Sequence, residues 1–195
     1  MNTDADALTI RRKATARVVC LVAAVCVILP CLGFRWLKAP KPYDAGLSLF
    51  DASECHRGWE GEQVCESKSN LTIAEGMRKN DVGLGTFAYA GWATFVVSIV
   101  SGLSLAAAGG LAFKDRFVRE PIALTTVALI GLVLALITAC VFIGSKPSMS
   151  VGVAWPFFLY GTGVVAGIAG AQMLAKAFSD VRDPYWDGLD QNPGA

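Results

Sequence analysis

The sequence has almost no histidine, and it lacks the short motifs that mark most catalytic and cofactor sites. His56 is the only histidine, so two histidines cannot ligate a haem iron from facing helices. No C-x-x-C pair occurs, although that spacing is a common way to lower a thiol pKa in redox proteins. A G-x-G-x-x-G loop, a Walker loop and a recognisable Ser-His-Asp set are missing as well. The sequence therefore predicts no catalytic residue, no metal site and no bound cofactor.

Charge is missing from four long stretches of the chain. Asp, Glu, Lys and Arg do not occur in residues 18–34, 82–113, 121–145 and 147–175. A helix needs about 20 apolar residues to cross a hydrocarbon core of roughly 30 Å, and a mid-membrane charge costs about 2.5–3.5 kcal/mol. The remaining residues are too few to cover four such helices as a soluble core would. The sequence predicts an all-α membrane protein, a bundle of four transmembrane helices, with no buried charge to relay protons or bind ions.

Basic residues flank the uncharged stretches on one side and predict the orientation. By the positive-inside rule the clusters at residues 11–17, 114–119 and 176–182 lie in the cytoplasm with both termini, in a plasma membrane or bacterial inner membrane. The net charge of +1 gives no field that favours a nucleic-acid partner. The expected segments are a cytoplasmic N-terminal segment 1–13, membrane helices 14–37, 86–113, 121–144 and 151–177, an extracytoplasmic loop 38–85, a cytoplasmic loop 114–120, a short outer loop 145–150 and a cytoplasmic tail 178–195.

The outer loop carries the most specific local signal, the pair Cys55 and Cys65. Thiols outside the cytoplasm tend to pair, and closing a loop of this length would stabilise the chain by about 2.5–3 kcal/mol. We therefore expect a structural disulfide. The alternatives are a redox pair that also uses Cys31, and a metal site that includes His56, which would still lack a fourth ligand. Asn70 begins an N-x-T sequon, a possible glycosylation site if the protein is eukaryotic.

Small residues recur at intervals of four in two of the expected helices. This period lets helix backbones approach closely in lipid, so these positions predict either packing within the bundle or contact with a partner. Pro30 should loosen the outer end of the first helix, and Trp36 should lie at interface depth. The small positions are Gly102, Ala106 and Gly110 in the second helix and Gly163 and Gly167 in the fourth.

The loop residues also resemble a known family. Trp36 is followed by Gly46-Leu47, Leu49-Phe50, and then Cys55 and Cys65. This order is similar to the claudin-like tetraspan group, which includes peripheral myelin protein and the gamma subunits of calcium channels, with Phe50 where the family has Trp. The resemblance covers the topology and about 30 loop residues. It implies a small β-sheet stapled by Cys55–Cys65 and seated on the bundle, with Gly46 to Phe50 as one strand.

These observations favour a non-enzymatic integral membrane interaction protein. We expect an accessory or structural subunit of a larger membrane complex, or a claudin-like protein that associates with copies of itself. Its expected partners are the lipid bilayer and other membrane proteins or copies. One alternative is a small membrane thiol-redox protein that uses Cys31, Cys55 and Cys65. A further alternative is a channel or carrier component, for which the helices offer only hydroxyl groups as a polar path.

Overall fold

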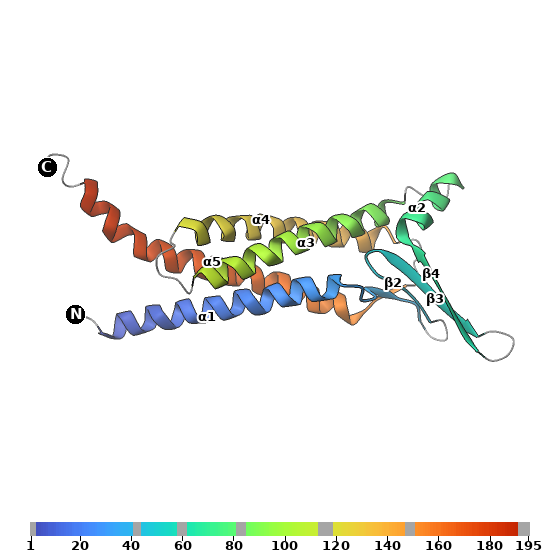
Figure 1. Cartoon of the computed structure of the whole chain (residues 1–195), viewed down its shortest axis with the longest axis horizontal. Helices are drawn as coiled ribbons and strands as arrows, with labels where there is room; N and C mark the ends of the chain where they lie inside the picture. Colours follow the sequence, from blue (N-terminus) through green and yellow to red (C-terminus); the bar gives the residue numbers. More distant parts are fainter. Residues whose placement is uncertain are drawn as a thin grey trace.

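The computed structural model describes residues 3–40, 44–57, 62–80, 85–112, 119–146 and 151–190. Four long helices form a rod with a small sheet at one end, and the ends of the chain lie at the other (Figure 1). They are α1 (Thr3–Ile28), α3 (Thr86–Leu111), α4 (Arg119–Gly144) and α5 (Trp155–Asp190), and a short helix α2 (Asn70–Lys79) accompanies the sheet. The segments Arg11–Cys31, Thr86–Leu111, Ile122–Gly144 and Trp155–Ala177 are long and apolar enough to cross a membrane. The prediction of four such helices is confirmed.

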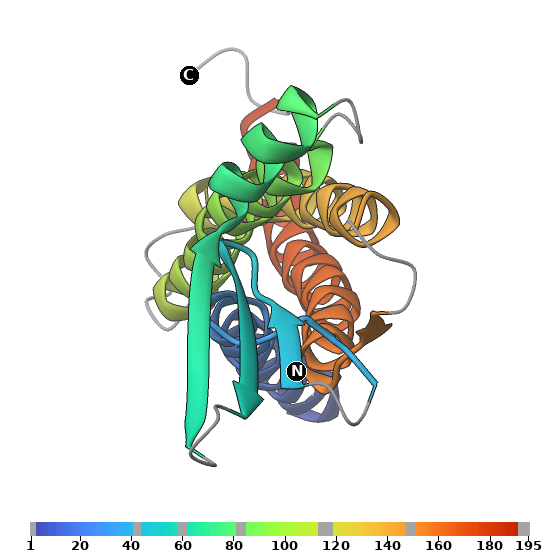
Figure 2. The same ribbon diagram turned by 90° about the vertical axis from the view of Figure 1, so that its right-hand side faces the viewer.

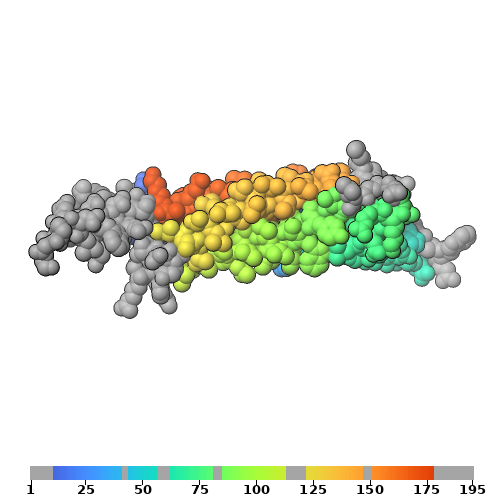
Figure 3. Space-filling model, turned by 90° about the horizontal axis from the view of Figure 1, so that it is seen from above, coloured from blue at the N-terminus to red at the C-terminus, as the bar shows by residue number. Residues whose placement is uncertain are grey.

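The helices form a ring in which α1 and α4 each pack against both α3 and α5. Figure 3 shows α4 and α3 side by side along the rod. α4 buries one narrow seam whose residues alternate in steps of three and four, the 3.5-residue period of a helix that contacts its neighbours along one stripe. Its other faces are apolar and exposed, which suits a membrane span and not a helix in water. The buried seam consists of Thr125, Ala128, Leu132, Ala135, Ala139 and Phe142.

A five-stranded antiparallel sheet covers the end of the bundle (Figure 2). Its strands are β1 (Leu37–Lys38), β2 (Asp44–Leu47), β3 (Asp51–Arg57), β4 (Gln63–Ser69) and β5 (Gly152–Val153), in the order β4-β3-β2-β1-β5. Four strands come from the loop between α1 and α3, and β5 comes from the segment between α4 and α5. The small sheet in the loop is therefore confirmed, whereas the contribution of β5 was not expected from the sequence.

The first membrane helix ends earlier than the expected range 14–37. α1 stops at Ile28, and Leu29–Cys31 form one turn of 3₁₀-helix that contains Pro30. Proline has no N–H for an α-helical hydrogen bond, so the last turn changes its geometry there. Gly33 then adopts a φ of 94°, which a side chain would oppose. The chain leaves the helix at this point and enters β1.

Trp36 is fully buried between the sheet and the bundle, and its interface depth stays a prediction. Its indole N–H donates a hydrogen bond of 2.8 Å to the carbonyl oxygen of Pro30. Its ring lies 4.7 Å from Tyr160 and 6.2 Å from Phe142, between centroids. The Tyr160 hydroxyl in turn lies 2.9 Å from that of Ser98. Trp36 therefore fills the space beneath the sheet, because the chain turns inward over the bundle at the end of α1.

Candidate functional site

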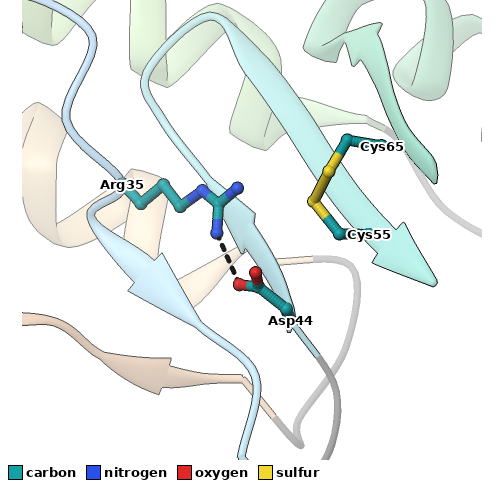
Figure 4. Close-up of a disulfide and its surroundings, with 4 residues drawn as sticks. All are labelled: Arg35, Asp44, Cys55 and Cys65. Atoms are coloured by element: carbon teal, nitrogen blue, oxygen red, sulfur yellow. Dashed lines mark hydrogen bonds and ion pairs between the residues drawn. A yellow bond between two sulfur atoms is a disulfide. The ribbon is translucent and has the colours of Figure 1, made fainter. Parts of the chain in front are cut away.

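The β3–β4 hairpin projects from the bundle and is closed by a disulfide bond. Cys55 and Cys65 are direct partners in the strand register, and their sulfur atoms are bonded (Figure 4). The expected disulfide is confirmed. Their Cα atoms are 4.0 Å apart, a separation typical of the closer, non-hydrogen-bonded pairs of an antiparallel ladder. Consequently the backbone N–H and C=O groups of Cys65 point away from β3.

The strand β4 lies at the free edge of the sheet. It pairs with β3 on one side, and no strand pairs with its other side in the described part of the chain. All seven of its residues are exposed. Backbone groups alternate along a strand, so Ser67, like Cys65, directs its N–H and C=O outward. The hairpin therefore presents unpaired backbone donors and acceptors, with Glu66 and Lys68 on one face.

A serine turn, and not a strand, connects β2 to β3. We expected Gly46 to Phe50 to form one strand, but β2 ends at Leu47. The Ser48 hydroxyl accepts hydrogen bonds from the backbone N–H groups of Phe50 and Asp51, both at 3.1 Å. The Ser48 N–H donates to the carbonyl oxygen of Asp51 at 2.8 Å. The backbone bond continues the register of β2 and β3, and the hydroxyl bonds support a two-residue turn at Leu49 and Phe50 that reverses the chain.

The turn seats the sheet on the helix α3. Leu49 is buried, and a Cβ added at Gly91 of α3 would clash with its carbonyl oxygen. Phe50 packs with ring centroids 4.7 Å from both Trp92 and Phe95. Aromatic pairs at this separation contribute about 0.5–1.5 kcal/mol beyond their buried area. Leu49 and Phe50 therefore form the contact between the sheet and α3.

Asn70 is a structural residue of this junction. Its side chain is completely buried, and its amide N–H donates to the carbonyl oxygen of Ser48 at 3.0 Å. Its backbone N–H donates to the carbonyl oxygen of Phe50 at 2.7 Å. The folded protein leaves no space for a glycan on a side chain in this position. The structure therefore disfavours glycosylation of Asn70, which stays a prediction from the sequence.

Three ion pairs lie at the sheet end of the described chain, one of them between Glu66 and Lys68 within β4 at 3.7 Å. Arg35 donates a hydrogen bond of 2.8 Å to Asp44 at the start of β2 (Figure 4). Gly46 lies beneath this arginine, where an added Cβ would be 2.7 Å from the Arg35 Cδ. On α2, the hydrogen bond and positive charge of Lys79 lower the pKa of the Glu75 carboxyl, and Glu75 in turn raises the pKa of Lys79. The sequence alone did not pair these residues.

The small residues divide between packed and open positions. At Gly102 an added Cβ would lie 2.6 Å from Ile28 of α1. At Gly163 it would lie 2.7 Å from Cys26 of α1, and at Gly167 2.9 Å from Leu132 of α4. Ala106 is partly buried, and Gly110 has no atom within 4 Å of such a Cβ. Three of the five expected positions therefore lie at close contacts between helices, whereas Gly110 is open.

The remaining cysteines lie in the helical part of the chain. Cys31 is buried, and its thiol donates to the carbonyl oxygen of Val27 at 3.2 Å. Cys20 is also buried, Cys26 is partly buried, and Cys140 is exposed on α4. No group of three metal-ligating side chains occurs among the residues that the structure describes.

The sheet end is seated on α3 by Leu49 and Phe50, and its β3–β4 hairpin is closed by the Cys55–Cys65 disulfide. A search for similar proteins gives no match to any protein-family model and none to any curated protein.

Proposed function

We propose that this chain is an integral membrane protein that acts by binding another membrane protein and not by catalysis. In this proposal its four helices cross the membrane, both termini lie in the cytoplasm, and the sheet lies outside. The apolar side chains exposed along the helices support insertion, among them Ile130, Val133 and Ile137 on α4. The protein would be an accessory subunit of a larger membrane complex.

The single observation that carries the proposal is the exposed edge of β4. An unpaired edge strand is a template for pairing with another chain, and proteins commonly cover or blunt such edges. Here seven residues are exposed, and no described part of the chain covers them. A partner strand could add to this edge through backbone hydrogen bonds, a recurring mode of recognition. The disulfide keeps the hairpin ordered before binding, which lowers the entropy lost on association.

A second candidate function is self-association, as the claudin-like resemblance implies. Its support is the charge pattern around Ser67. If two β4 strands pair antiparallel about a two-fold axis at Ser67, Glu66 of each copy lies opposite Lys68 of the other. Opposite charges in such cross-strand positions contribute roughly 0.2–1 kcal/mol per pair. Because Ser67 directs its backbone groups outward, the central pair would exchange two hydrogen bonds.

The edge is tested by replacing Ser67 with proline. Proline removes one outward N–H, and an edge strand tolerates it where that N–H does not bond within the sheet. Ser67→Ala is the matched control, because it loses the same hydroxyl, which bonds Asp51 at 3.1 Å, but keeps the N–H. After gentle extraction from the native membrane, we expect the proline variant to lose its complex and the alanine variant to keep it. If the proline variant, with its disulfide intact and its thermal stability unchanged, keeps the complex, the edge is not the interface. If the wild type purifies as a solitary monomer, the proposed function fails.

Charge exchange separates the two candidates. Glu66→Lys or Lys68→Glu alone would weaken a symmetric dimer, whereas the double exchange would restore it, because the two copies remain complementary. An accessory subunit bound to a different chain has no reason to recover in the double variant. The particle mass then states whether the complex contains only copies of this chain.

A further inference from the structure

α1 and α5 run antiparallel and pack closely. An added Cβ would lie 2.7 Å from Cys26 of α1 at Gly163 and 3.0 Å from Val19 at Gly170, whereas at Gly167 it would meet Ala23 at 3.6 Å. The register of these contacts places the start of the span Arg11–Cys31 of α1 beside the last membrane turn of α5. The contacts are Gly163 with Cys26, Gly167 with Ala23, and Gly170 with Val19 and Cys20.

Continuing this register by two helical turns brings two cations together at the end opposite the sheet. Arg12 of α1 and Lys176 of α5 line one cavity of about 250 Å³ with Met173 and Ala177. Met173, Lys176 and Ala177 are spaced by three and four, so they share one face of α5. Arg12 and Lys176 are exposed. Met173 is 43% exposed and lies about one turn closer to the sheet than Lys176 does.

The cavity combines the features that an amphiphilic anion requires. Two basic side chains from different helices can donate several hydrogen bonds to phosphate oxygens, and an arginine guanidinium matches their geometry. One turn further into the bundle, Met173 offers an apolar surface for the first methylene groups of an acyl chain. Within the described residues Arg12 forms no ion pair, whereas Lys176 has a further interaction in the chain. Arg12 is therefore the side chain on which the site depends.

We propose that the cavity formed by Arg12, Met173, Lys176 and Ala177 binds the phosphate group of an anionic phospholipid of the cytoplasmic leaflet. Basic pockets between transmembrane helices at this depth are known to suit anionic headgroups. The proposal uses the membrane orientation given under the proposed function and goes beyond it, because the site lies at the opposite end from β4. The bound lipid would tie the α1–α5 contact to the composition of the membrane.

The site is tested by counting the lipids bound to the full chain. The protein is placed in nanodiscs of equal parts phosphatidylglycerol and phosphatidylcholine with identical acyl chains, released, and weighed by native mass spectrometry. We expect the wild type to retain phosphatidylglycerol in preference to phosphatidylcholine. Arg12→Gln should reduce this retention about ten-fold, and the double variant with Lys176→Gln about 100-fold, because each loses a charge-assisted hydrogen bond to the phosphate, roughly 1.5 kcal/mol each.

Arg11→Gln is the matched control, because Arg11 is the neighbouring exposed cation and does not line the cavity among the residues described. It should retain the lipid within about two-fold of the wild type, since only diffuse surface attraction is lost. Equal losses in the Arg11 and Arg12 variants would overturn the site in favour of diffuse attraction. Displacement of the lipid by millimolar inorganic phosphate would instead assign the cavity to the free anion and overturn the lipid proposal. A chain that does not enter nanodiscs refutes the proposed membrane insertion, whereas insertion without a headgroup preference refutes this site alone.

Discussion

The substitution Gly163→Ala tests the close contact between α1 and α5. The new Cβ would lie 2.7 Å from the Cys26 Cβ, 2.9 Å from the Cys26 carbonyl carbon and 3.1 Å from the Val27 nitrogen. Two of these are backbone atoms that cannot rotate away, so α1 and α5 must separate. Forcing extra volume into a packed contact costs about 1–3 kcal/mol. Alanine also favours the helix by about 1 kcal/mol over glycine, which offsets part of this cost.

Gly161→Ala is the matched control, because nothing lies within 4 Å of a Cβ at Gly161 on the same helix. Both variants gain the same helix propensity, so their difference in stability, about 1–3 kcal/mol, reports the clash alone. Thermal unfolding in detergent, followed by tryptophan fluorescence, measures it. At about 2–4 °C per kcal/mol for a chain of this size, the Gly163 variant should melt several degrees below the Gly161 variant. Equal melting temperatures would refute the close α1–α5 contact.

Three further substitutions test the sheet end. Replacing Cys55 and Cys65 by serine should lower the free energy of unfolding by about 2.7 kcal/mol, because the open loop gains entropy in the unfolded chain. Amide hydrogen exchange should accelerate in β3 and β4 and stay unchanged in α3. Uniform acceleration would contradict a hairpin that the disulfide stabilises locally. Trp36→Ala should cost about 3–5 kcal/mol, and Trp36→Phe less, as measured by chemical unfolding; equal stability of the two variants would contradict the filled space under the sheet. When the chain is made in a eukaryotic secretory pathway, Asn70 should remain unglycosylated in the folded protein, so that deglycosylation causes no gel shift. Asn70→Asp should lower the stability of the protein, because a carboxylate would face the Ser48 carbonyl oxygen.

The helices could be predicted from sequence because lipid imposes a simple rule. A span must exclude charge over about 20 residues. The uncharged stretches 82–113 and 121–145 contain the spans Thr86–Leu111 and Ile122–Gly144, and the other two stretches overlap the spans Arg11–Cys31 and Trp155–Ala177. The disulfide could be predicted as well, since Cys55 and Cys65 are the only cysteines of the long loop between the first two uncharged stretches. Packing in the fourth helix followed from the spacing of Gly163 and Gly167. The same reasoning could not predict that Gly110 is open, because small residues at a period of four define a face of a helix but do not show which neighbour packs against it.

The parts that the sequence did not predict depend on contacts between distant segments. β5 has two residues, and no local pattern marks a strand that short. Tryptophan is typical of membrane interfaces, but Trp36 is buried inside the protein, because Pro30 and Gly33 turn the chain over the bundle. α2 did have a local signal. The Ser69 hydroxyl accepts a hydrogen bond from the Leu71 N–H at its start, and Arg78 and Lys79 occupy its last turn, where cations favour the helix dipole.

The pairing of β5 with β1 has a consequence for biogenesis. Lys38 of β1 pairs with Gly152 of β5, which the ribosome adds more than a hundred residues later, so this pairing cannot form until then. At roughly 5–20 residues per second of synthesis, the edge of β1 remains open for several seconds to about 20 s while α3 and α4 are made. A nascent chain that stops before β5 lacks the strand that completes the sheet. Quality control could therefore distinguish finished from unfinished chains by whether that edge of β1 is still accessible.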